Sequence, residues 1–192
     1  MERIVLASAS PRRRDLLKQI GVEFTVVPSG IDESQVEGSD YLDLVQRLAQ
    51  VKATQVAQTM DSALIIAADT IVVYNKEEVL GKPNSKREAE KMLKKLSGTE
   101  HQVITGIAIK DLNKSIEIVD YEITDVLMRE LTQQEITDYV ATGEPMDKAG
   151  AYAIQGRGAI LINSIRGLFS NVVGLPLTKV VTHCKKLGYK LA

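Results

Sequence analysis

The feature that most constrains the fold is the apolar run at residues 64–73, which reads LIIAADTIVV. A run of this length with so few polar residues is typical of a strand covered on both faces of a sheet. We therefore expect a central strand here. Asp69 is the only charge in the run, and a carboxylate buried there is costly unless it is paired or bound to a metal. The alternative is that Asp69 ends the strand and caps a neighbouring turn.

Extended and helical patterns are mixed along the rest of the chain. Short apolar or alternating runs predict further strands at 4–7, 24–27, 101–109, 115–127 and 159–165. Amphipathic spacing and end signals predict helices at 11–20, 39–59, 86–96, 132–142 and 177–187. A turn is expected at 80–83 and a loop at 167–176. The predicted class is α/β: an elongated mixed β-sheet flanked by helices, in two lobes with a central cleft, within one domain spanning 1–192.

Charge and cysteine usage narrow the class of protein. The 192 residues carry a formal net charge of −1, which argues against a general nucleic-acid binder. Cys184 is the only cysteine, so no disulfide can form within the chain. The apolar stretch at 4–7 is too short for a secretion signal, and no stretch approaches the length of a membrane span. We expect a cytoplasmic protein with no membrane or nucleic-acid partner.

The segment 8–13, SASPRR, is a candidate phosphate-binding element. A strand that enters a helix through small residues leaves backbone N–H groups exposed, and the helix dipole favours an anion there. Arg12 and Arg13 add two cations with forked donors that suit phosphate oxygens. Helical geometry places Arg13 on the packed side and Arg14 on the opposite edge. The alternative is a plain capped helix whose basic first turn is solvated.

Four further residues are weaker candidates when each is taken alone. Glu33 lies in a loop, where acidic residues are usually solvated, but oxygen ligands from this loop and from Asp69 would suit Mg²⁺. Lys52 falls near the apolar face of its helix, where most lysines extend outward to water. Lys82 sits in a Gly-Lys-Pro turn, and turn lysines mostly face solvent. Gln155, in a glycine-rich stretch, has the donor and acceptor that suit a base edge, although a hairpin without a ligand is the alternative.

Two absences exclude other classes. No G-x-x-x-x-G-K-[ST] pattern occurs, which argues against a P-loop nucleotidase or kinase. His101 and His183 are the only histidines, and their spacing does not suggest a zinc site.

Four segments, in this order and spacing, resemble the Maf family of nucleoside-triphosphate pyrophosphatases. They are residues 6–13 (LASASPRR), residues 68–70 (ADT) with 80–83 (LGKP), residues 96–106, and residues 147–156 (DKAGAYAIQG). Residues 171–176 also look like a closing segment of that family. The match runs along nearly the whole chain, and jointly the motifs are far more specific than any one of them.

The resemblance implies hydrolysis of a nucleoside triphosphate to the monophosphate and pyrophosphate, with Mg²⁺ or Mn²⁺. It also implies the fold shared with inosine-triphosphate pyrophosphatases. By match to the motifs, Asp69 is expected to be the proton acceptor and, with Glu33, to bind the metal. The residues expected to bind phosphate are Ser8, Arg12, Arg13, Lys52 and Lys82. Those expected to set base choice are Arg12, Thr70 and Gln155.

Residues 148–156 are similar to the branch of the family that acts on dTTP, UTP and modified uridine triphosphates. House-cleaning of the nucleotide pool is the role that this branch implies, and homodimers are common in the family. The family's name comes from an association with septum formation. A nucleotide-binding regulator of cell division without relevant catalysis is therefore the alternative function.

Overall fold

The computed structural model describes residues 3–191, and contacts divide it into two compact units. Unit 1 comprises Met1–Asp69, Thr105–Glu122 and Gly174–Ala192, and unit 2 comprises Thr70–Ile104 and Ile123–Val173. Residues 1, 2 and 192 of the predicted domain lie outside the described residues. No helix in the described part of the chain is long and apolar enough to cross a membrane.

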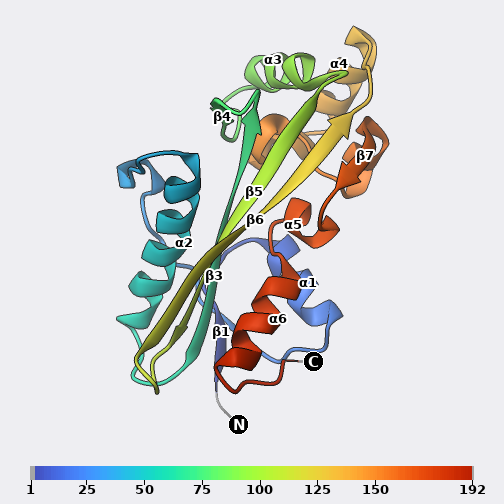
Figure 1. Ribbon diagram of the computed structural model, residues 1–192. Helices are drawn as coiled ribbons and strands as arrows, with labels where there is room; N and C mark the ends of the chain where they lie inside the picture. Colours follow the sequence, from blue (N-terminus) through green and yellow to red (C-terminus); the bar gives the residue numbers. More distant parts are fainter. Residues whose placement is uncertain (1–2, 192) are drawn as a thin grey trace. The chain divides into compact units, whose positions relative to one another are not determined.

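Three long strands contribute residues to both units: β3 (Leu64–Tyr74), β5 (Glu100–Asp111) and β6 (Ile116–Met128). Unit 1 adds β1 (Ile4–Leu6), α1 (Pro11–Gln19), β2 (Thr25–Val26), the 3-10 helix η1 (Glu33–Gln35), α2 (Tyr41–Ala57) and α6 (Leu177–Lys186). Unit 2 adds β4 (Glu78–Leu80), α3 (Lys86–Leu96), α4 (Gln133–Ala141), η2 (Glu144–Asp147), η3 (Ala149–Ala151), η4 (Gly156–Leu161), β7 (Ile162–Arg166) and α5 (Phe169–Val173). Figure 1 labels most of these elements.

The strands pair in the order β2-β1-β3-β5-β6-β7, and β4 pairs with β3. The sheet is mixed, because β1 runs parallel to β2 and β3, whereas β4 is antiparallel to β3 and β7 is antiparallel to β6. In β3, residues 64–69 are all buried, as the apolar run predicts. The predicted α/β class, the mixed sheet and its central strand are therefore confirmed.

Each unit has its own apolar core. In unit 1, α2 lies on one face of the strands, with α1 and α6 on the other (Figure 1). The core between α2 and the strands is built from small and β-branched side chains, among them Val5, Ala49, Ala53 and Ile65. The core of unit 2 is larger in side-chain volume, because Leu93, Leu96 and Met128 pack there with Tyr139 and Tyr152. Small side chains under α2 let that helix approach the sheet closely.

The predicted helices are close to the observed ones, and two local signals explain why. The helix predicted at 86–96 has those bounds, and Ser85 caps it by accepting a hydrogen bond from the Glu88 amide. The helix predicted from 132 is α4, where Thr132 and Glu135 form the expected capping box. Such caps are encoded by neighbouring residues, so sequence alone identifies them.

Two predicted segments were wrong and one strand was missed, each for a local reason. The strand predicted at 159–165 begins only at Ile162, because residues 156–161 form η4. The predicted loop 167–176 contains α5, whose five residues are too few to show helical periodicity. The strand β4 was missed, although Asn75, which adopts a left-handed conformation at φ 49°, starts the tight turn that precedes it.

Gly106 in β5 allows α2 to lie directly on the sheet. A Cβ atom at this position would lie 2.2 Å from the backbone oxygen of Val45, so Gly106→Ala forces the helix away. We expect a loss of about 1–3 kcal/mol in the free energy of unfolding, as for other overpacked sites. Gly81→Ala is the matched control, because its Cβ would meet nothing within 4 Å, and its stability should change by less than about 0.5 kcal/mol. Urea unfolding of both variants tests this, and equal stabilities would contradict it.

Candidate active site

The junction between β1 and α1 holds a buried arginine. Arg13 Nε donates to the carbonyl oxygen of Gly174 at 2.7 Å, and its Nη1 donates to Ser8 Oγ at 3.2 Å. Ser8 Oγ also accepts from the Ser10 amide at 3.2 Å. Arg13 is only 9% exposed and Ser8 only 6%. The guanidinium is therefore fixed in place beside the N-terminus of a helix, where an anion is favoured.

The three consecutive arginines differ in environment, as helical geometry predicts. Burial lowers the pKa of Arg13, and the nearby charge of Arg12 lowers it further, whereas Asp69 and Glu33 raise it. Arginine nevertheless stays protonated in proteins. Arg12 is partly exposed, and Arg14 is exposed and pairs with Asp15 at 3.5 Å. Arg13 is thus the buried cation of this turn, and Arg14 lies outside the cluster.

Lys52 joins two carboxylates from different segments. Its Nζ lies 2.5 Å from Asp69 Oδ1 and 2.6 Å from Glu33 Oε1. The side chains of Lys52 and Asp69 are only 8% and 10% exposed, whereas that of Glu33 is 48% exposed. The lysine does not extend outward to water, as most lysines near an apolar face do, because the buried Asp69 attracts its ammonium group. We call Ser8, Arg13, Glu33, Lys52 and Asp69 the charged cluster.

Local structure explains why these residues meet. Asp40 caps α2 by accepting from the amides of Leu42 and Asp43, each at 2.8 Å, which fixes the start of the helix that carries Lys52. Asp32 accepts from the Ser34 amide at 3.1 Å and so begins η1, in which Glu33 is the first residue. β3 provides Asp69 from the centre of the sheet. All of these residues belong to unit 1.

The donor set of the cluster fits a divalent cation. The ammonium of Lys52 contacts oxygens of both Glu33 and Asp69, so the two carboxylates already share one cation. No group of three His, Cys, Asp or Glu side chains that could hold a metal occurs among residues 3–191. Two carboxylates, with water and phosphate oxygens as the other ligands, are a common way for proteins to bind Mg²⁺. The fit is thus to a metal that arrives with a phosphate-bearing ligand.

Three other predicted site residues, Thr70, Lys82 and Gln155, belong to unit 2. Thr70 follows Asp69 directly in β3 and is partly buried. Lys82 is exposed in the turn after β4, and the Gly81 carbonyl of that turn accepts from the Gly150 amide at 3.1 Å. Gln155 is exposed and immediately precedes η4.

Sequence reasoning missed one partner in the cluster. Gly174 accepts a hydrogen bond from Arg13 through its backbone carbonyl, and the two residues are 161 positions apart. A backbone carbonyl so far along the chain leaves no residue-type signal, so this contact could not be predicted.

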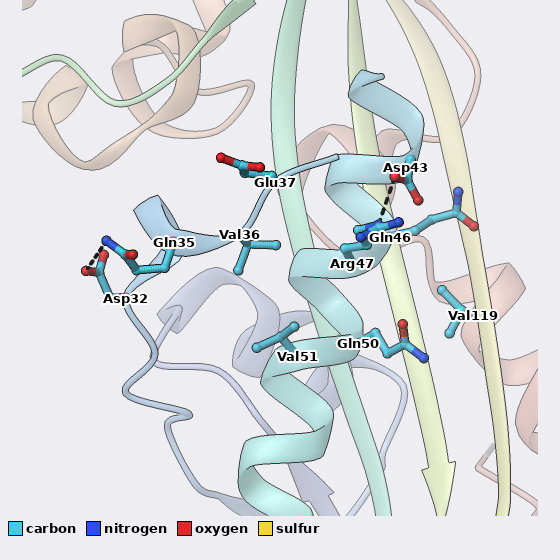
Figure 2. A pocket seen from close by; sticks show the side chains of 10 residues that line it. All are labelled: Asp32, Gln35, Val36, Glu37, Asp43, Gln46, Arg47, Gln50, Val51 and Val119. Atoms are coloured by element: carbon cyan, nitrogen blue, oxygen red, sulfur yellow. Dashed lines mark hydrogen bonds and ion pairs between the residues drawn. The ribbon is translucent and has the colours of Figure 1, made fainter. Parts of the chain in front are cut away.

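A separate hollow of about 690 Å³ opens on unit 1 between residues 32–37 and the exposed face of α2 (Figure 2). None of the predicted site residues lines it. Some of the charged side chains that line the hollow already form ion pairs with each other, since Arg47 Nε lies 2.8 Å from Asp43 Oδ2. The charged cluster is a better candidate for the active site than this hollow, because positively and negatively charged side chains are buried together in it.

The fold and the cluster together define an α/β protein in which a buried arginine at the start of a helix accompanies two carboxylates joined by a lysine. The family model described as Maf-like protein matches residues 3–187, and the chain belongs to this family. A dTTP/UTP pyrophosphatase of Pelotomaculum thermopropionicum is 49% identical over 191 residues, covering 100% of both chains. A dTTP/UTP pyrophosphatase of Methanosarcina mazei is 50% identical over 189 residues, covering 98% of this chain and 95% of the relative.

Solved structures support the fold. A HAM1 protein from Coxiella burnetii matches with a TM-score of 0.51 and 15% identity, covering 93% of this chain and 90% of that one. The Staphylococcus aureus Ham1 protein matches with a TM-score of 0.51 and 18% identity, covering 84% and 80%. At such identities the likeness concerns the fold alone.

Lys52→Met tests the electrostatic role of the lysine. Removing the ammonium leaves Asp69 buried without its cation, so we expect a loss of about 3 kcal/mol or more in the free energy of unfolding. Lys110→Met is the matched control, because that lysine pairs with Glu117 at 3.1 Å and is 26% exposed, and its loss should cost less than about 1 kcal/mol. Denaturant unfolding gives both values.

A double-mutant cycle then separates charge from packing. Lys52→Met combined with Asp69→Asn should cost less than the sum of the single variants, since a neutral amide at position 69 no longer needs the cation of Lys52. Strict additivity would show that the two side chains do not stabilise each other.

Proposed function

We propose that the protein hydrolyses nucleoside triphosphates, with dTTP and UTP as its main substrates, to the nucleoside monophosphate and pyrophosphate. The observation that carries the proposal is the buried contact of Lys52 with Asp69, adjoined by Glu33 and close enough to the fixed guanidinium of Arg13 for the charges to interact. The two relatives described above bear the name dTTP/UTP pyrophosphatase and match over nearly the full chain. Modified uridine triphosphates are further candidates, which fits house-cleaning of the nucleotide pool.

A local set of positively charged side chains binds the triphosphate. A triphosphate carries about four negative charges, so a chain with a net charge of −1 needs a local set of cations. Arg13 and Ser8 hold phosphate oxygens at the start of α1, where the amides of the first turn add donors. Arg12, Lys52 and Lys82 complete the set of phosphate-binding residues. The pyrophosphate that leaves stays bound at the start of α1, beside Arg12 and Arg13.

Asp69 acts as the proton acceptor. A water oxygen forms a bond to the α-phosphorus while the bond from that phosphorus to the oxygen bridging the β-phosphorus breaks. The electron pair leaves with pyrophosphate, and the water proton passes to Asp69. The contact with Lys52 holds the buried carboxylate in one orientation until then. The guanidinium groups of Arg12 and Arg13 stabilise the negative charge that develops on the leaving pyrophosphate.

Glu33 and Asp69 are the residues that would hold Mg²⁺ or Mn²⁺. A bound divalent ion would neutralise phosphoryl oxygens and lower the charge repulsion that opposes attack. Base choice falls to Arg12, Thr70 and Gln155. Gln155 has an exposed amide with both a donor and an acceptor, which suits the edge of a pyrimidine. A homodimer and a cytoplasmic location stay predictions.

Asp69→Asn tests the catalytic assignment. The amide cannot accept the proton, so we expect kcat for pyrophosphate release from dTTP and UTP to fall at least about 100-fold while the circular dichroism spectrum is unchanged. Asp61→Asn, at an exposed position before the same strand, is the control and should keep full activity. A folded Asp69→Asn protein with near wild-type turnover would refute the assignment.

The same assay separates the alternatives. Orthophosphate as the first product would mean that a different bond is cleaved. Nucleotide binding without metal-dependent turnover in the wild-type protein would favour the regulator of septum formation. No feature of the described residues favours that alternative over catalysis.

Glu33→Gln tests the metal site. Removing one of the two carboxylate ligands should raise the Mn²⁺ concentration needed for half-maximal pyrophosphate release by about tenfold or more. Calorimetric titration of the protein with Mn²⁺ in the presence of a non-hydrolysable dTTP analogue should show the same loss of affinity. Glu37→Gln, an exposed neighbour in the same loop, is the control and should leave both values unchanged. Identical Mn²⁺ dependence in the two variants would exclude Glu33 as a ligand.

A further inference from the structure

A second carboxylate, outside the charged cluster, organises the backbone next to Gln155. Glu144 is the first residue of η2 and has no role in the reaction described above. Its Oε1 accepts from Tyr139 Oη at 2.9 Å and from the Gly158 amide at 3.0 Å. Its Oε2 accepts from the Arg157 amide at 3.1 Å. One side chain thus binds two successive amides that lie two and three residues after Gln155.

The charge state of Glu144 suits this role. Burial alone would raise the pKa of Glu144, but the bonds from the two amides and the phenol hold the pKa below its ordinary value. The pKa of Tyr139 is raised by burial and by its bond to this carboxylate, so the phenol stays protonated and donates. Hydrogen bonds to an ionised acceptor are about twice as strong as neutral ones. The segment is therefore held by charge-assisted bonds at neutral pH.

The backbone between Gln155 and Arg157 is shaped to fit this carboxylate. Gly156 adopts a left-handed conformation at φ 65°, and a Cβ atom there would lie 2.9 Å from Glu144 Oε2. Only glycine allows the chain to pass this close to the carboxylate without strain. The direction in which the chain leaves Gln155 is therefore fixed by Glu144.

We propose that Glu144 is a positioning residue that sets base selectivity by holding Gln155 in one orientation. The inference rests on the proposed function, in which Gln155 reads the base. Glu144 acts through the backbone of 156–158 and does not touch the substrate. Discrimination by a glutamine amide depends on placement, because a shift of about 1 Å can cost up to about 100-fold in rate. All of these residues belong to unit 2.

Glu144→Gln tests the proposal, because the amide nitrogen cannot accept the hydrogen bond that Oε2 receives. The readout is the ratio of kcat/KM for UTP to kcat/KM for GTP. We expect this ratio to fall about tenfold, mainly through a higher KM for UTP, with kcat changed less than KM. Tyr139→Phe is the matched control, since it removes the phenol bond but keeps both amide bonds, and it should retain the ratio. An unchanged ratio in folded Glu144→Gln would overturn the proposal.

A double-mutant cycle with Gln155→Ala distinguishes positioning from general stability. Where Gln155 is absent, Glu144→Gln should leave the ratio unchanged, because there is no side chain left to position. An equal fall in both backgrounds would overturn the proposal. If Glu144→Gln does not fold, Glu144→Asp replaces it, keeping the charge at a shorter reach; a partial fall in the ratio is expected, and an unchanged ratio would again overturn the proposal.

The failure of this inference can be told apart from the failure of the proposed function. A wild-type protein with no preference for UTP over GTP contradicts the proposed role of Gln155, and this inference with it. A preference that is present in the wild-type protein but insensitive to Glu144 contradicts this inference alone.

Discussion

The contact between the Lys52 ammonium and the Asp69 carboxylate is the interaction on which unit 1 depends. Both side chains are nearly buried, and each would be costly without the other. They meet because α2 lies close to the sheet, over small side chains such as Ala49 and Ala53 and over Gly106. The close packing of α2 against the sheet therefore has an electrostatic consequence, because it brings Lys52 on the helix within reach of Asp69 on the central strand.

The same contact leaves a charge balance that suits a metal and a phosphate together. Among Arg13, Lys52, Glu33 and Asp69, the two positive charges equal the two negative ones, and Arg12 adds one more positive charge. An anion alone would be repelled by the carboxylates, and a cation alone by the arginines. A divalent cation that arrives with a triphosphate satisfies both, because the carboxylates take the metal and the cations take the phosphate oxygens. Under the proposed function, selectivity for a metal–nucleotide complex would follow from this pairing.

Sequence predicted the parts of the fold that are encoded locally or by strong patterns. The run 64–73 predicted a central strand, and Ser85 and Thr132 marked helix starts. Sequence could also suggest Asp69 as a site residue, since one charge in an apolar strand needs a partner. It could not pair Asp69 with Lys52, because that contact depends on tertiary packing. Residues 159–161, the end of η4, were mistaken for the start of a strand. The hydrogen bonds that fix the first turn of η4 are accepted by Glu144, which is too far away along the chain to leave a local signal.

Glu144, which is partly buried, and Asp69, which is buried, show two ways in which a protein can bind a carboxylate. Asp69 is matched by a side-chain cation that moves with its rotamers, so its partner can change when a metal or phosphate arrives. Glu144 is matched by backbone amides and a buried phenol, which cannot move without disturbing η4. An exchangeable partner suits a group that takes part in chemistry, and fixed partners suit a group that only holds geometry. The bonding partners thus match the proposed reactivity of Asp69 and the proposed positioning role of Glu144.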